Sequence, residues 1–252
     1  SVTSLNFSPD LVWIKQRSGS ATAHTLEDVL RGTSKHLASN ATDAEVDVSV
    51  YGGGVTAFNS NGFSVGSWGA VNLSSNTYVG WCWKGIGNSS TSSVTNTAGS
   101  ITGGSQVRAN PSAGFSIVTW SVGTAVNNST IGHGLNAAPS FIICKTRTAS
   151  NQNWIVYHKN LGTGDYLALE STQGSDTRFS TIWGTSAPTS TVFGVGLSGY
   201  SNNTSSNNYV AYCFSPVSGY SSMSSYVGNG SSDGPFVFTG MRPRWVLIKK
   251  SS

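Results

Sequence analysis

One strand-like motif, written three times, constrains the fold of this chain more than any other feature. It reads SPDLVWIKQRS from Ser8, APSFIICKTRT from Ala138 and RPRWVLIKKSS from Arg242. In each copy an apolar run follows a proline, and a lysine stands six positions after that proline. Proline cannot donate to a sheet ladder, so it marks the start of a strand, and the apolar run predicts that the strand is buried.

A second phrase repeats in step with the first. YVGWCW begins at Tyr78, 69 residues after Pro9, and YVAYCF begins at Tyr209, 70 residues after Pro139. GFSIVTW from Gly114 and GPFVFTG from Gly234 precede the second and third prolines. The period of about 105 to 130 residues has the size of a domain rather than of a short solenoid unit. We therefore infer an internal duplication followed by the beginning of a third copy.

Composition shifts place the boundaries of these copies. The stretch GIGNSSTSSVTNTAGSITGGS after Lys84 is dense in Gly, Ser, Thr and Asn and holds no aromatic residue, which is typical of a linker or exposed loop. The predicted organisation is a first β-sandwich repeat over 1–85, a linker over 86–105, a second repeat over 106–228, and an incomplete third repeat over 229–252.

The incomplete third copy cannot bury its own apolar side chains, because an isolated hairpin is marginal in water. We expect residues 234–250 to add to the sheet of a neighbouring repeat or subunit, in place of the GFSIVTW strand that the first copy lacks. The residues expected to mediate this strand addition or oligomer contact are Phe236, Phe238, Trp245 and Leu247.

The remaining pattern predicts an all-β protein of two tandem antiparallel sandwiches, jelly-roll or lectin-like, with a C-terminal strand or hairpin. Short β-branched and aromatic runs alternate with Gly, Asn and Ser clusters throughout. The exception is residues 23–32, where apolar side chains at helical spacing and a final glycine predict a helix. The run 78–83 is apolar on both faces, which predicts a central strand covered on both sides.

Charge and cysteine content narrow the class of partner. Charged residues make up 10% of the chain and the net charge is +4, spread along the sequence, which argues against a nucleic-acid partner. No apolar run reaches the roughly 20 residues that span a bilayer, so no membrane insertion is expected. Cys82, Cys144 and Cys213 lack the spacing of a disulfide framework or metal clamp, and we interpret them as small buried hydrophobes.

The residues give little support to catalysis, and we predict no enzyme activity, no cofactor and no metal site. The ten acids are thinly spread, although a glycan-cleaving enzyme would require a carboxylate pair, with Asp165 and Glu170 as the residues to test. His133, between two glycines, suits either a ligand loop or a turn whose imidazole bonds to backbone, and we favour the turn.

Tryptophans beside Gly- and Ser-rich stretches are the candidates for a glycan-binding site. An indole ring can pack on the apolar face of a sugar while amides bind its hydroxyls. The candidates are Trp68, Trp120 and Trp183. The alternative is that these rings pack in the core or at its rim.

Together these phrases resemble a repeated β-rich module of tail-fibre-like and other virion structural proteins of tailed bacteriophages, mainly marine ones. The phrases FSPDLVWIKQRS, TYVGWCWK, ANPSAGFSIVTW, GHGLNAAPSFIICKTR, NNYVAYCFSPVSGY and DGPFVFTGMRPRWVLIKK carry the resemblance, which covers nearly the whole chain. It implies a place on the exterior of a bacteriophage particle. It transfers no catalytic residue to this sequence.

We therefore predict a non-enzymatic virion structural protein of a tail fibre, spike or capsid decoration. Its expected partners are other virion proteins, further copies of itself, for example as a trimer, and a host cell-surface glycan. One alternative is a carbohydrate-binding module or receptor-binding lectin, and another is a glycan depolymerase.

Overall fold

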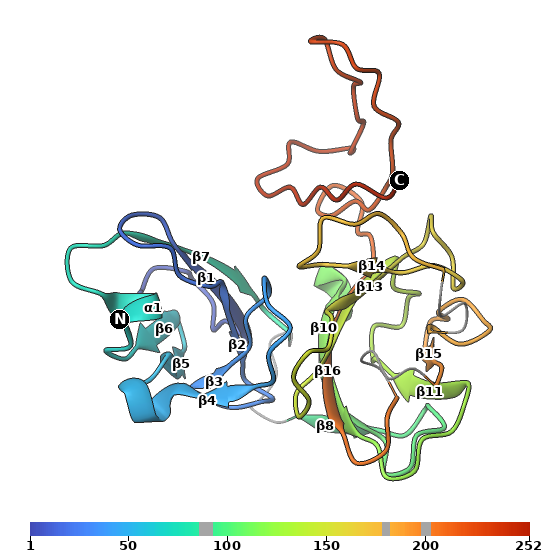
Figure 1. The fold of residues 1–252 in the computed structure, drawn as a ribbon, viewed down its shortest axis with the longest axis horizontal. Coiled ribbons are helices and arrows are strands. Elements are labelled where there is room, and N and C mark those ends of the chain that lie inside the picture. Colours follow the sequence, from blue (N-terminus) through green and yellow to red (C-terminus); the bar gives the residue numbers. More distant parts are fainter. Residues whose placement is uncertain (86–92, 178–181, 198–202) are drawn as a thin grey trace.

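The computed structural model describes residues 1–85, 93–177, 182–197 and 203–252 (Figure 1). Within these ranges the protein is mostly β, with antiparallel strand pairing throughout, which confirms the predicted all-β class. Its helices in this part of the chain are single turns: η1 (Val48–Tyr51), α1 (Gly69–Asn72) and η2 (Pro111–Ala113). No helix among the described residues is long and apolar enough to cross a membrane.

The first 85 residues form one three-stranded sheet and two small two-stranded sheets. The larger sheet has the order β2-β1-β7, and the small ones are β3-β4 and β5-β6. The strands are β1 (Leu11–Gln16), β2 (Thr25–Asp28), β3 (Lys35–His36), β4 (Val46–Asp47), β5 (Val55–Asn59), β6 (Gly62–Val65) and β7 (Tyr78–Trp83).

The rest of the chain forms a seven-stranded sheet of order β14-β13-β12-β16-β10-β9-β8 and a two-stranded sheet of β11 and β15. Its strands are β8 (Val94–Asn96), β9 (Ser105–Asn110), β10 (Phe115–Ser121), β11 (Ser129–Gly132), β12 (Phe141–Thr146), β13 (Ile155–His158), β14 (Leu167–Ala168), β15 (Val192–Val195) and β16 (Asn208–Phe214). Strand β8 lies inside the predicted linker 86–105, of which residues 86–92 fall outside the described ranges.

The repeated phrases pair in the same register in both halves. In β1 and β7, Val12 stands opposite Cys82, and in β12 and β16, Ile142 stands opposite Cys213. The outer neighbours correspond as well, because β2 flanks β1 as β13 flanks β12. Duplication of one strand pair predicts this correspondence. Cys82 and Cys213 therefore hold equivalent places in β7 and β16.

The core lies in three layers that follow the alternation of side chains along the strands. One cluster fills the space between the two large sheets, which Figure 1 shows side by side, and it draws buried residues from both halves. The second lies between the seven-stranded sheet and the β11-β15 pair, and the third between the three-stranded sheet and the β5-β6 pair. On β1, Trp13 faces the shared cluster and Val12 faces the third one. The two halves therefore share a core.

The helix predicted at residues 23–32 is wrong. Residues Thr25–Asp28 form β2, which pairs along β1 with all four side chains buried. The carboxylate of Asp28 then accepts hydrogen bonds from the backbone N–H groups of Leu30 and Arg31, both at 3.0 Å, which turns the chain. An Asx turn offers the backbone an alternative to a helix, so the apolar side chains of this stretch meet the core from a strand and a turn.

Candidate assembly surface

Strand β7 has an open edge where its counterpart β16 does not. Strand β16 is hydrogen-bonded to β12 on one side and β10 on the other, whereas β7 pairs with β1 alone among the described residues. Residues Tyr209 to Cys213 are buried, while their counterparts in β7 are only half-buried and Gly80 is exposed. The prediction that residues 78–83 form a central strand is therefore wrong: among the described residues, no strand lies beside β7 where β10 lies beside β16.

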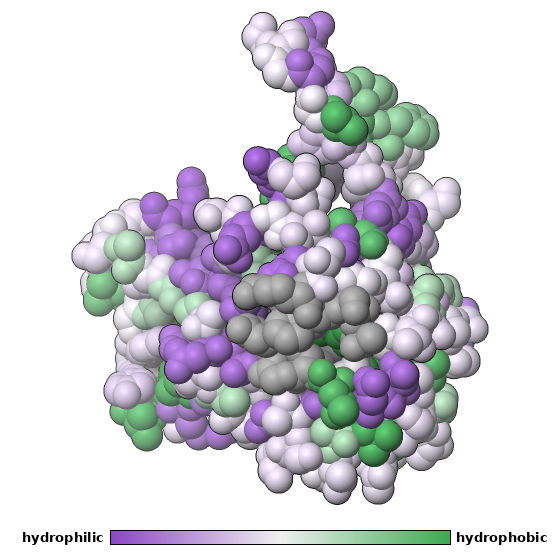
Figure 2. Space-filling view, turned by 45° about the vertical axis from the view of Figure 1, so that its right-hand side comes forward, coloured by the Kyte–Doolittle hydropathy of each residue, from purple (hydrophilic) through white to green (hydrophobic). Residues whose placement is uncertain are grey.

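The C-terminal segment, residues 226–252, contains no strand or helix and carries apolar side chains into solvent. Phe236 is 89% exposed and Phe238 is 79% exposed, and Val246 and Ile248 are also exposed. The segment projects from the body of the molecule at the red end of the colour scale in Figure 1, and Figure 2 shows hydrophobic side chains gathered on this projection. Patches of this kind mark interaction sites on soluble proteins.

Part of the C-terminal segment is held against the body through an aromatic cluster. The ring of Trp245 lies 5.7 Å from that of Trp83 and 6.4 Å from that of Trp13, measured between centroids. Trp83 also packs against Phe115 and Phe214, so the cluster joins the ends of β7, β10 and β16. Edge-to-face aromatic contacts of this geometry stabilise a packed arrangement beyond the area they bury.

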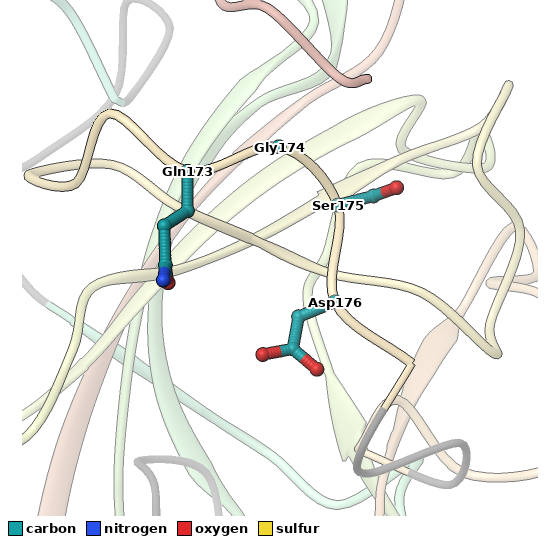
Figure 3. A pocket seen from close by; sticks show the side chains of 4 residues that line it. All are labelled: Gln173, Gly174, Ser175 and Asp176. Carbon is teal, nitrogen blue, oxygen red and sulfur yellow. The ribbon is translucent and has the colours of Figure 1, made fainter.

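The last residues of the chain meet the loop around Gly174. The Lys249 Nζ donates hydrogen bonds to the carbonyl oxygens of Ser171 at 2.7 Å and Gln173 at 2.6 Å, and the Ser175 N–H donates to the Ser251 carbonyl at 2.8 Å. A pocket at this loop is lined by Gln173, Gly174, Ser175 and Asp176, and Figure 3 shows the Ser175 side chain pointing away from those of Gln173 and Asp176. Residues 245–251 are therefore anchored, and residues 234–240 are not.

Two of the three tryptophans expected to bind glycan are buried. Trp120 is 4% exposed and Trp183 is 1% exposed, and both lie in the core between the seven-stranded sheet and the β11-β15 pair. Neither ring offers a face to a sugar, so these two are corrected to core residues. Trp68 is partly exposed, with its ring 4.9 Å from that of His36.

His133 adopts the predicted turn arrangement. Its side chain is fully buried, its Nε2 lies 3.1 Å from the Thr189 carbonyl, and its Nδ1 accepts from the Leu135 N–H at 3.2 Å. Gly134 has φ 72°, the left-handed region that favours glycine. Burial lowers the pKa of His133, with the Thr189 hydrogen bond opposing this effect. The imidazole therefore supports the turn as a buried neutral group.

None of the three cysteines forms a disulfide, and two of them are buried. Cys144 and Cys213 are buried and Cys82 is half-buried, which confirms the prediction of small hydrophobes for the first two. Burial raises the pKa of Cys82 to about 11 and that of Cys144 well above its usual range. Among the residues with assigned positions, no group of three or more His, Cys, Asp or Glu side chains could hold a metal ion.

The acids named for a depolymerase do not stand out as a pair. The Glu170 carboxylate accepts a hydrogen bond from the Trp154 N–H at 3.1 Å, and burial raises its pKa while the nearby charges of Lys145 and Lys249 lower it. Asp165 lies in the preceding loop and is half-buried. A backbone-bonded carboxylate of this kind orders the loop after β14.

A buried charge network, not foreseen from the sequence, joins the two halves. The Arg31 guanidinium donates to the Asp28 carboxylate at 2.5 Å and to Glu45 at 3.1 Å, and the Tyr212 hydroxyl donates to Asp28 at 2.8 Å. Arg147 donates to Glu45 at 2.8 and 2.9 Å. The side chains of Arg31 and Asp28 have no exposed surface. Asp28 and Arg31 already meet within one turn, but no motif marks the whole network, because Tyr212 and Arg147 join it only when the two halves pack together.

Comparison with known proteins gives a family and no further relatives. No curated protein and no solved structure matches the chain. The family model described as a domain of unknown function, DUF7483, matches residues 1–252, so the chain belongs to that family.

Proposed function

We propose that the protein is a non-enzymatic structural component of a tailed-bacteriophage particle. It lies on the exterior of the particle in a tail fibre, spike or capsid decoration, and it associates with other particle proteins and with copies of itself. Its two halves are two tandem copies of one β-sandwich module of the jelly-roll or lectin type, and residues 229–252 begin a third. The matched registers of the β1-β7 and β12-β16 pairs support the duplication.

One observation carries the assembly part of this proposal: a single chain presents both an open sheet edge and an unpaired apolar segment. Natural sheet proteins usually blunt or cover their edges, because an open edge templates pairing with another chain. Among the described residues β7 has a free edge, and Phe236 and Phe238 lie in solvent. These features suit a subunit whose sheet edge and apolar segment are covered when it contacts another subunit. The resemblance of the sequence to a module of virion structural proteins supports the proposed location.

Locating the chain in intact particles tests this proposal. Purified particles of a bacteriophage that encodes the chain would be analysed by quantitative mass spectrometry and by gold-labelled antibody in electron microscopy. The expected result is a fixed copy number relative to the major capsid protein and label confined to one exterior structure. Absence of the chain from purified particles, with the capsid protein detected in the same sample, would contradict the proposal.

Contact with a host surface glycan, and the alternative of a dedicated carbohydrate-binding protein, now depend on Trp68. It is the partly exposed member of the predicted set, and its ring packs on His36. A glycan array with wild type and Trp68→Ala tests this contact. Saturable binding that is lost in the variant supports it, and binding that survives shows that the ring takes no part.

A further inference from the structure

The open edge of β7 has a template for its missing neighbour within the same chain. In the second half, β10 lies against β16 with Phe115 opposite Phe214, Ser116 opposite Cys213 and Val118 opposite Ala211. In sequence, GFSIVTW of β10 corresponds to GPFVFTG from Gly234. The strand type that completes β16 therefore occurs once more, in the part of the C-terminal segment that is not anchored.

We propose that residues 234–240 of one copy add to the open edge of β7 in a second copy, antiparallel, in the register that β10 has on β16. This deepens the proposed function by specifying how copies join, and it rests on that function only for the biological setting. Because Pro235 would be the first residue of the added strand, its missing N–H is tolerated there. Phe236 would stand opposite Cys82, Val237 opposite Trp81 and Phe238 opposite Gly80.

The side chains fit the surface that this register gives them. Gly80 is exposed, and a Cβ at this position would lie 3.4 Å from the Phe63 ring, so an aromatic side chain beside the glycine would contact Phe63. Phe238 opposite Gly80 would fill this position, and cross-strand pairs of an aromatic residue with a glycine compensate for the missing glycine side chain. Phe236 would cover the same face beside the half-buried Cys82.

The donor comes from another copy because Trp245 is seated on the first half of its own chain. In the proposed register Gly240 stands opposite Tyr78, at the far end of β7 from Trp83. That end-to-end length is five residue steps, about 17 Å at 3.4 Å per residue. Only five steps separate Gly240 from Trp245, whose ring contacts Trp83. Doubling back over this length would leave few residues for a turn, which favours a donor from another copy as long as Trp245 stays in place.

Each copy thus carries one donor and one acceptor, which are different surfaces. Such a head-to-tail contact joins copies into a closed ring or an open filament. The main-chain hydrogen bonds of strand addition supply the attachment, and the side chains at 236 and 238 set the register.

A single cysteine tests the register and the donor together. In Phe236→Cys the new thiol would face Cys82 of the next copy, and the roughly 5.5 Å Cα separation of a hydrogen-bonded antiparallel pair lies within the disulfide range. Purified full-length protein would be oxidised mildly and run on non-reducing gels. The expected result is a ladder of disulfide-linked oligomers that disappears on reduction and in Phe236→Cys with Cys82→Ser. Cys144 and Cys213 are buried and do not compete.

Val237→Cys is the matched control, because its side chain would point to the opposite face of the added strand. Its oligomer yield should not exceed that of wild type. A second pair, Thr239→Cys with Val79→Cys in a Cys82→Ser background, tests the same register at a closer cross-strand position. Light scattering should give a larger mass for wild type than for Phe238→Asp.

Different outcomes would overturn different parts of the proposal. An internal disulfide in a monomer would assign the edge to the same chain and overturn the second-copy donor. Equal cross-linking in Phe236→Cys and Val237→Cys, or none with either cysteine pair, would overturn the register. None of these results bears on whether the chain is found in particles, so this inference and the proposed location can fail separately.

Discussion

At the level of single residues, Arg31 is the most consequential charge in the protein. Its guanidinium has no exposed surface and holds the Asp28 and Glu45 carboxylates while donating to the Tyr212 hydroxyl at 3.2 Å. Replacing a buried ion pair by apolar residues can be neutral, but removing one partner leaves a buried charge uncompensated. Removing one charged partner should therefore destabilise the fold, whatever net stability the intact network contributes.

We expect Arg31→Met to lower the free energy of unfolding by about 3 to 5 kcal/mol, because the Asp28 carboxylate would remain buried without its partner. Denaturant unfolding followed by tryptophan fluorescence measures this. Lys35→Met is the control, since the Lys35–Asp47 pair is exposed and should contribute little. Equal stability of Arg31→Met and wild type would show that the buried Asp28 carboxylate does not depend on Arg31.

Two buried groups of the first half, Glu27 and His36, should make the stability of the fold depend on pH in opposite directions. The Glu27 carboxylate accepts from the Val55 N–H at 3.0 Å, and burial raises its pKa to about 7. A raised carboxyl pKa stabilises the fold below the unfolded-state value of 4.5, and this contribution is lost as the pH rises to about 7. For His36, burial followed by the charge of Arg31 lowers the pKa to about 4, so its contribution is lost as the pH falls from 6.5 towards 4.

Glu27→Gln should therefore gain stability relative to wild type as the pH rises from about 4.5 to 7, by about 3 kcal/mol in total at 1.36 kcal/mol per pKa unit. Unfolding midpoints in urea across pH 4 to 8 measure the difference. His36→Gln serves as the counterpart, because its difference from wild type should change in the opposite sense between pH 4 and 6.5. A Glu27→Gln difference that stays constant with pH would contradict the raised carboxyl pKa.

At the level of elements, the sequence predicted the strands that a local motif defines and missed those features that depend on neighbours. The first two proline-led runs and both aromatic phrases form β1, β12, β7 and β16, as their alternation and β-branched content predict. The third proline-led run, from Arg242, forms no strand within the single chain, so the predicted C-terminal strand or hairpin is wrong there: this run has no neighbouring strand to pair with. Residues 23–32 combine a strand with an Asx turn, and their apolar spacing fits a helix equally well. The open edge of β7 could not be predicted from the sequence. Apolar side chains show that the faces of a strand are covered, but they do not show whether another strand pairs with its edge.

The small β5-β6 pair depends on a close backbone approach at Gly66. The Gly66 N–H donates to the Gly54 carbonyl at 2.8 Å, and a Cβ at this position would collide with the carbonyl oxygens of Gly52 and Gly53. Backbone atoms cannot move aside as a flexible side chain can, so we expect Gly66→Ala to cost about 1 to 3 kcal/mol of stability, the usual range for overpacking.

Gly69→Ala is the matched control in the neighbouring helix α1. Its Cβ would meet only Leu73 Cδ1 at 4.0 Å, and alanine favours a helix over glycine by roughly 0.5 to 1 kcal/mol. Thermal unfolding by circular dichroism should thus show a lower midpoint for Gly66→Ala and an equal or higher one for Gly69→Ala. Similar midpoints for both would show that the turn relaxes around the added methyl group.

At the level of the whole molecule, the predicted repeats are joined by a shared core. Trp13 and Leu26 of the first half pack in one cluster with Ile143 and Tyr212 of the second. The Trp154 Nε1 also donates to the Ala38 carbonyl at 2.7 Å across the two halves. The sequence could not predict this, because a strand with two apolar faces shows that both faces are covered without identifying the partner. The same limit hid the Arg31 network, because Tyr212 and Arg147 reach it from the second half of the chain.

A shared core predicts that the two halves unfold together. Calorimetry of the 252-residue chain should give one transition whose calorimetric and van't Hoff enthalpies agree, as a two-state transition requires. Residues 1–85 alone should give no cooperative transition, since Leu11, Trp13 and Leu26 would face water. Ile143→Ala, which removes a buried side chain of the second half, should shift the whole transition at a cost of about 2 to 5 kcal/mol. Two resolved transitions, of which Ile143→Ala moves only one, would instead show that the copies are independent domains that merely touch.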